Sequence, residues 1–264
     1  MARDKHTSMQ YRNNPRYKTK TRRLLAIALL VFVITAVIML LNAQVEYRKA
    51  QNEYNDLRLL EPSPSSSIVS SPAPSDEKPI SSPQVVTEFA QKLLDINPDY
   101  IGWIKIEDTV IDYPIVQGAD NGTYINRTFS GEYNASGSIF MDWKCEGRFS
   151  NSLAVLFGHK MKDGSMFASL HSYQDNTYLE KHPDISVTLP NGETLTYKIF
   201  AVRLTTVTDS LFSLFDKEQK DIEDYFSEYD APEGATRFLV LSTCTTGGND
   251  NNRLLIFAAL TLEQ

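Results

Sequence analysis

Apolar residues are distributed in two ways along the chain, as one long run near the N-terminus and as many short runs further on. Residues 24–41 contain no charged side chain over 18 positions, which is close to the minimum needed to cross a ~30 Å hydrocarbon layer. A signal peptide has a shorter apolar core and a cleavage site of small residues, which residues 42–44 match poorly. We therefore expect residues 24–41 to form a single transmembrane helix.

The segment after this run, residues 42–60, is polar and compatible with a juxtamembrane helix. Four of its residues follow a 3-4-3 spacing: Tyr47, Ala50, Tyr54 and Leu57. This pattern is short for a coiled-coil seam, so a solvated continuation of the membrane helix is the favoured interpretation. Residues 61–84 are rich in Ser and Pro, which cannot build a core, and we interpret them as a flexible linker.

The folded domain is expected over residues 85–264. Ser82 and Pro83 have the preferences of an N-cap and a first helical turn, and they predict a helix that ends at Asn97. Turn signals then separate eight apolar runs with strand character: 101–106, 110–116, 138–141, 153–159, 185–189, 194–207, 238–243 and 253–260. Short helices fit residues 165–182 and 217–228. This pattern favours a single, mainly β domain built as a β-barrel with few helices.

The net charge is divided unevenly along the chain. Residues 1–23 hold eight Lys or Arg and one Asp, a net charge of +7, so the rest of the chain carries −14 within the total of −7. By the positive-inside rule, residues 1–23 form a cytoplasmic tail and the domain is exported to the extracellular side of the cell membrane. The basic tail favours anionic lipid, whereas the acidic domain argues against nucleic acid as a partner.

Two cysteines occur in the sequence, Cys145 and Cys244. A disulfide between them and a retained free thiol are both compatible with the sequence. Cys145 lies in a charged turn that offers a nucleophile no shaped pocket. No His/Cys/Asp cluster has zinc spacing and no calcium-loop pattern is present, so neither a metal nor another cofactor is expected.

Three residues suited to acyl transfer each stand at the end of a predicted strand. Cys244 follows the run 238–243 and precedes a Gly-rich loop, which would hold a thiol rigidly beside a cleft. His159 ends the run 153–159, where a neutral imidazole can exchange protons with a thiol and a leaving amine. Arg253 begins the last run, and its guanidinium can stabilise a carbonyl oxygen that gains negative charge. We take these three as the candidate catalytic residues.

The residues before the second cysteine read Val240-Leu241-Ser242-Thr243-Cys244 and resemble the Thr-Leu-x-Thr-Cys signature of the sortases, with Val in place of the first Thr. Further stretches resemble class B sortases, in order along residues 85–262: Ile101–Ile104, Ile111–Pro114, Gln117–Asn121, Gly137–Asp142, Gly158-His159 and Asp163–Phe167. A series of matches in order is more specific than the cysteine motif alone.

This resemblance implies a closed eight-stranded barrel with N-terminal helices and a helix before the late strands. It also implies a cysteine transpeptidase of Gram-positive bacteria. Such an enzyme cleaves the sorting signal of an exported surface protein after a Thr and forms a thioacyl-enzyme. It then transfers the protein to an amine of a cell-wall peptidoglycan precursor.

Site residues can be carried over from the family by position. Cys244 matches the nucleophile, His159 the general acid/base and Arg253 the carbonyl-binding arginine. Six more positions match residues that line the sorting-signal groove: Asn121, Ile125, Leu211, Phe212, Ser242 and Thr245. Some relatives carry an acidic residue where Thr245 stands.

Three alternative functions stay open from the sequence. The first is a cysteine peptidase that releases the acyl group to water, although papain-like enzymes place Cys before His. The second is a pilus-assembling sortase, although the N-terminal lid motif of class C is not seen. The third is a non-catalytic wall-binding module, against which the intact Cys, His and Arg set counts.

Overall fold

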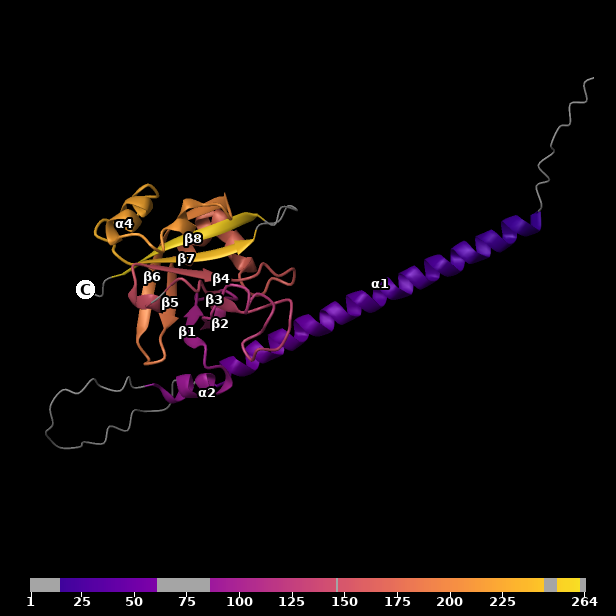
Figure 1. Cartoon of the computed structure of the whole chain (residues 1–264), viewed down its shortest axis with the longest axis horizontal. Helices are drawn as coiled ribbons and strands as arrows, with labels where there is room; N and C mark the ends of the chain where they lie inside the picture. Colours follow the sequence, from indigo (N-terminus) through magenta and orange to yellow (C-terminus); the bar gives the residue numbers. More distant parts are fainter. Residues whose placement is uncertain (1–14, 61–85, 146, 245–250, 262–264) are drawn as a thin grey trace, which may run out of the picture. The chain divides into compact units, whose positions relative to one another are not determined.

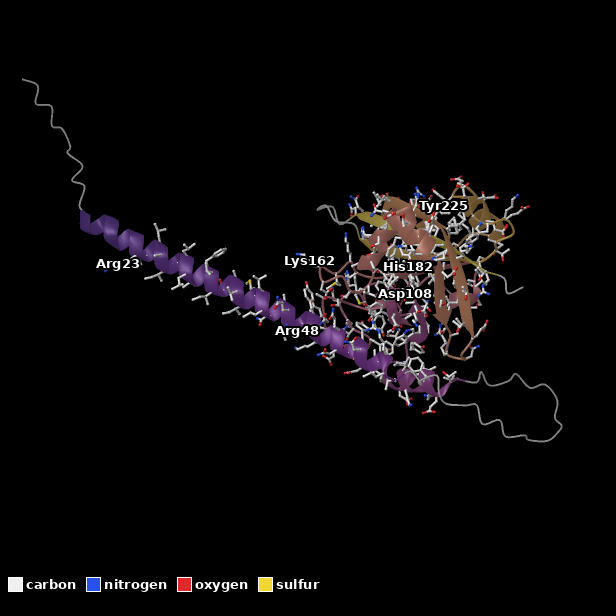
Figure 2. All side chains as sticks on the ribbon, turned by 180° about the vertical axis from the view of Figure 1, so that it is seen from behind. Arg23, Arg48, Asp108, Lys162, His182 and Tyr225 are labelled. Atoms are coloured by element: carbon white, nitrogen blue, oxygen red, sulfur yellow. The ribbon has the colours of Figure 1, made fainter. Side chains whose placement is uncertain are left out.

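The computed structural model describes residues 15–60, 86–145, 147–244 and 251–261, with the backbone alone for residues 15–22 and Cys244. It divides the chain into two units, Met1–Glu46 and Tyr47–Gln264. Helix α1 (Pro15–Arg58) forms the first unit and continues into the second. Over residues 24–41 its large apolar side chains project on all sides and are exposed (Figure 2). Among the described helices, this one is long and apolar enough to cross a membrane. The predicted linker lies outside the described residues.

A closed barrel of eight strands forms the centre of the second unit (Figure 1). The strands are β1 (Tyr100–Lys105), β2 (Asp112–Val116), β3 (Ile139–Met141), β4 (Leu153–Phe157), β5 (Asp184–Thr188), β6 (Thr194–Thr206), β7 (Phe238–Cys244) and β8 (Asn252–Leu260). Their order around the barrel is β1-β2-β3-β4-β7-β8-β6-β5, and β5 closes on β1. The β2–β3 and β4–β7 pairs are parallel and the others are antiparallel. Each strand overlaps one predicted run, so the predicted closed barrel is confirmed.

Short helices surround the barrel: α2 (Glu88–Ile96), η1 (Arg148–Ser150), η2 (Ala168–Gln174), α3 (Asn176–Lys181), η3 (Ser210–Ser213) and α4 (Gln219–Ser227). The predicted helix before the late strands is confirmed as α4, whose Phe226 ring stacks on Phe238 of β7 with centroids 4.2 Å apart. Residues 165–182, where short helices are predicted, contain two of them, η2 and α3. Asp175 ends η2 and caps α3, because its side chain accepts a hydrogen bond from the backbone N of Thr177.

Helix α2 begins later than the sequence predicts. Its N-cap is Thr87, whose hydroxyl accepts a hydrogen bond from the backbone N of Ala90 at 3.1 Å. The backbone N of Thr87 also donates to the carbonyl of Pro190 at 2.9 Å, which fixes this residue in extended geometry. Thr87 is therefore the N-cap of the described helix, and the start predicted at Ser82 and Pro83 lies outside the described residues. The predicted end was right, because Asn97 is the C-cap.

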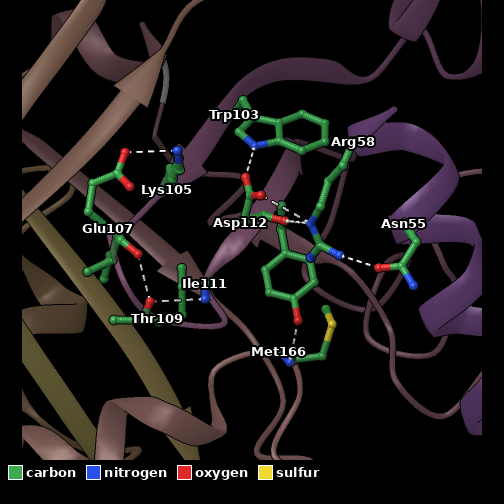
Figure 3. A network of polar contacts seen from close by, with 11 residues as sticks. Asn55, Arg58, Trp103, Lys105, Glu107, Thr109, Ile111, Asp112 and Met166 are labelled. Atoms are coloured by element: carbon green, nitrogen blue, oxygen red, sulfur yellow. Dashed lines mark hydrogen bonds and ion pairs between the residues drawn. The ribbon is translucent and has the colours of Figure 1, made fainter. Parts of the chain in front are cut away.

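Residues 42–58 continue the membrane helix, as predicted, but one face of the last three turns is packed against the barrel and not solvated, so this part of the interpretation was wrong. Ala50, Tyr54 and Leu57 are 2%, 2% and 4% exposed. Their 3-4 spacing places them on one helix face, and this face is the one that packs. Arg58 fixes the end of the helix, with its Nε 2.9 Å from the carbonyl oxygen of Asp112 (Figure 3). The compact unit therefore begins before the predicted boundary at residue 85.

Leu57→Ala should reduce the free energy of unfolding of the second unit by about 2–4 kcal/mol, the usual effect of truncating a buried leucine. Leu59→Ala is the matched control, because Leu59 is 81% exposed and its truncation should change little. Urea unfolding of the full chain in detergent micelles, followed by tryptophan fluorescence, measures both. Equal stability of the two variants would show that this helix face does not contribute to the folded unit.

Candidate active site

Strand pairing brings the three predicted catalytic positions to adjacent strand ends. In the parallel β4–β7 pair, Phe157 lies beside Ser242, and His159 and Cys244 each follow two residues later in the same direction. In the antiparallel β7–β8 pair, Cys244 is paired directly with Arg253. The backbone therefore gathers a histidine, a cysteine and an arginine at one end of three consecutive strands.

His159 is oriented by a backbone carbonyl. Its Nε2 lies 2.5 Å from the carbonyl oxygen of Ile125. A carbonyl oxygen can only accept a hydrogen bond, so we assign the ring proton to Nε2, and Nδ1 is then the nitrogen available for proton transfer. The backbone on either side is also held, because Phe167 N donates to the carbonyl of His159 at 2.9 Å. The sequence offered no carboxylate to orient this imidazole, and Ile125 takes that role through its main chain.

Gly158 is required beside the histidine by close packing. A Cβ atom at this position would lie 2.6 Å from both Ile139 Cδ1 and the Phe167 ring, which is closer than real Cβ contacts. A larger residue here would displace β3 or the loop after β4, and His159 with them.

A cavity of about 200 Å³ opens at these strand ends and is called the histidine cavity here. Its lining residues are Asn121, Ile125, Phe140, Phe157, Gly158, His159, Ser242, Thr243 and Arg253. The hydroxyls of Ser242 and Thr243 are buried and have no hydrogen-bond partner in the described structure.

A second cavity of about 290 Å³ shares three lining residues with the first and is called the aromatic cavity here. It is lined by Asn121, Asp142, Lys144, Phe157, Val207, Phe212, Phe215 and Arg253. Phe157 and Phe212 stack with centroids 6.2 Å apart and form an apolar wall. The two cavities together form an extended groove with apolar sides and a few polar groups, as expected for a peptide chain.

Four of the six predicted groove residues line the two cavities: Asn121, Ile125, Phe212 and Ser242. Leu211 is fully buried and is not among the lining residues, and Thr245 lies outside the described residues. Asn121 is fixed in the groove, because its Nδ2 donates to Asp142 Oδ2 at 3.0 Å and its Oδ1 accepts from Trp143 N at 3.1 Å.

Sequence reasoning assigned no role to Asp142, Lys144, Phe157 or Phe215, although all four line the aromatic cavity. Asp142 is buried, and its second carboxylate oxygen accepts from the backbone N of Lys144 at 3.0 Å. The only signal was that Asp142 ends the stretch Gly137–Asp142, which resembles class B sortases. The aromatic positions carried no signal beyond hydrophobicity.

The other cysteine is not suited to nucleophilic attack. Cys145 is a free thiol with 1% of its surface exposed. Burial raises the pKa of the Cys145 thiol to about 12, so almost no thiolate forms near neutral pH. The disulfide that the sequence allowed is therefore not present at Cys145.

A larger cavity of about 430 Å³ lies between the end of α1 and the barrel. None of the three candidate catalytic residues lines it. Among the described residues, no group of three or more His, Cys, Asp or Glu side chains could hold a metal ion. We therefore assign the candidate active site to the histidine cavity. This cavity is smaller, but two of the candidate catalytic residues, His159 and Arg253, line it.

Comparison with known proteins identifies the family. The model of the sortase domain matches residues 104–261. Sortase B of Listeria monocytogenes is 37% identical over 172 residues, which make up 61% of this chain and 69% of the relative. Sortase B of Staphylococcus aureus is 29% identical over 178 residues, or 64% of this chain and 72% of the relative. The crystal structure of sortase B from B. anthracis in complex with AAEK1 superposes with a TM-score of 0.64 at 25% identity, covering 83% of this chain and 99% of that one.

A closed eight-stranded barrel with these helices is the fold of a sortase-type protein. The chain belongs to the sortase family, and it is similar to the class B members. Membership implies a cysteine transpeptidase, and sortases act on proteins that carry a sorting signal and on cell-wall precursors.

Arg253→Lys should lower the rate constant of acylation roughly 10²-fold, the scale of losing one oxyanion donor, because lysine keeps the charge but lacks the forked donors. Arg127→Lys is the control, since Arg127 is exposed and donates to the carbonyl of Gly131 on the surface. Single-turnover acylation measures both variants, alongside a thermal melt. A variant at position 253 that melts and acylates like the parent would make that arginine structural.

Proposed function

We propose that this protein is a membrane-anchored sortase that joins exported proteins to a cell-wall amine. Residues 24–41 would span the cell membrane once, with residues 1–23 in the cytoplasm and the barrel outside. The proposal is supported above all by the pairing of Cys244 with Arg253, next to the strand that leads into His159. Nucleophile, proton carrier and oxyanion donor would then act on one carbonyl group.

The first step is acylation. His159 Nδ1 first takes the proton of the Cys244 thiol, and the resulting thiolate attacks the carbonyl carbon of a Thr in the sorting signal, so that an S–C bond forms. Arg253 donates hydrogen bonds to the carbonyl oxygen while it carries negative charge. When the C–N bond breaks, His159 gives the proton of its Nδ1 to the leaving amine. The product is a thioacyl-enzyme with a neutral imidazole, whose Nε2–H still donates to the Ile125 carbonyl.

The second step is transfer. An incoming cell-wall amine loses a proton to His159 Nδ1 as it attacks the thioester, and the S–C bond breaks to return the Cys244 thiolate. The acceptor decides between a transpeptidase and a peptidase, because water at the same position would release a free acid. The histidine and aromatic cavities would hold the sorting-signal peptide, with the aromatic wall around its apolar side chains.

Cys244→Ala should abolish formation of the thioacyl-enzyme, whereas Cys145→Ala should leave its rate within a few-fold of the parent, because the Cys145 thiol is buried and protonated. The full chain in detergent micelles is incubated with a panel of sorting-signal peptides, with and without amines such as triglycine. Mass spectrometry reports the covalent adduct and the released products.

Each outcome of this assay separates one function from another. An amine-linked product is expected from a transpeptidase, and a free acid formed equally with and without amine would indicate a peptidase. Binding of the peptide with no covalent adduct would favour a wall-binding module. Equal loss in both cysteine variants would show that Cys145 takes part in the reaction.

A further inference from the structure

Tyr54, in the last turns of α1, is hydrogen-bonded to a loop beside the candidate active site. Its side chain is 2% exposed, and its hydroxyl donates to the carbonyl oxygen of Gly137 at 2.6 Å. Burial raises the pKa of the Tyr54 phenol above its ordinary value, so the group stays protonated and remains a donor. The ring also packs edge-on against Tyr113, with centroids 5.2 Å apart. This hydrogen bond is short and buried.

Gly137, which accepts that hydrogen bond, lies against the catalytic histidine. Its φ of +59° favours glycine, and a Cβ here would lie 3.1 Å from His159 Cδ2. The same Cβ would be 2.5 Å from the Ile125 carbonyl oxygen and 2.9 Å from that of Tyr124. The backbone of Gly137 therefore touches both the imidazole ring and the carbonyl that holds its Nε2.

We propose that Tyr54 is a positioning residue for His159, held in place by the docked helical segment from Ala50 to Arg58. Tyr54 fixes the Gly137 carbonyl, and Gly137 limits how far the His159 ring and the Ile125 carbonyl can move. Docking of this segment would then set the orientation of Nδ1 toward the reaction. This inference rests on the proposed transpeptidase function. It adds that docking of the segment after residues 24–41 influences the rate of acylation.

The segment has other anchors, so the contribution of Tyr54 can be tested without releasing it. Arg58 donates to the Asp112 carbonyl, pairs with its carboxylate at 3.2 Å and lies over the Tyr113 ring (Figure 3). Gln51 Nε2 donates to Asp163 Oδ2 at 3.1 Å. Tyr54→Phe removes one hydroxyl and keeps the ring packing, so the helix is expected to remain docked.

The test is Tyr54→Phe in the full chain in detergent micelles. Its single-turnover acylation rate constant should fall about five-fold, the order expected for one lost hydrogen bond, with the KM for peptide unchanged within two-fold. Tyr47→Phe, on the same helix and half-buried, is the matched control and should acylate like the parent. Both are measured below the melting range of the least stable variant.

A spectroscopic readout separates positioning from loss of stability. In chain labelled with ¹⁵N-histidine, Tyr54→Phe should shift or broaden the ring signals of His159. It should leave those of His182 unchanged, since the His182 Nδ1 lies 3.1 Å from the Glu107 carbonyl on another part of the barrel. Parent-like acylation, unchanged His159 signals, or an equal effect of Tyr47→Phe would each overturn the proposal. A parent chain that forms no thioacyl-enzyme would instead contradict the proposed function.

Discussion

The hydrogen bond from His159 Nε2 to the Ile125 carbonyl is the interaction on which the proposed chemistry depends. It fixes one tautomer and one ring orientation, so a single nitrogen is left to carry protons in both steps. A backbone carbonyl carries no formal charge, so it orients the ring by a hydrogen bond alone. The packing of Gly137, Gly158 and Phe167 serves to hold this one contact.

Strand register is the second constraint. β4, β7 and β8 are buried along their lengths, with residues such as Leu156, Leu241 and Ile256 fully enclosed. A slip of one residue would move each side chain to the opposite buried face and disrupt the packing on both faces, so the register that pairs Cys244 with Arg253 is fixed by hydrophobic packing. The site is thus placed by the barrel core. The loops that follow β4 and β7 begin at the site because these two strands end there.

Most of the barrel could be predicted from the sequence, because its strands are apolar runs separated by clear turn signals. The candidate catalytic residues could also be found, since Cys, His and Arg side chains have chemistry that stands out at strand ends. The orienting group of His159 could not, because a main-chain carbonyl has no residue signature. The packing of Tyr54 could not be predicted for a related reason. The 3-4-3 spacing of residues 47, 50, 54 and 57 indicates one face of a helix, but it does not indicate which surface that face contacts. The N-cap of α2 is Thr87 and not Ser82. The backbone N of Thr87 donates to the carbonyl of Pro190, and this contact could not be predicted because Pro190 is distant in the sequence.

The protonation of His159 tests this account most directly. In the full chain labelled with ¹⁵N-histidine, the nitrogen shifts of the neutral ring distinguish the protonated from the unprotonated nitrogen. The account predicts a proton on Nε2, with the strong hydrogen bond to the Ile125 carbonyl seen as a downfield proton signal, and an unprotonated Nδ1. A neutral ring that carries its proton on Nδ1 would contradict the account, because the Ile125 carbonyl could not then accept from Nε2 and the proposed proton carrier would face the wrong way.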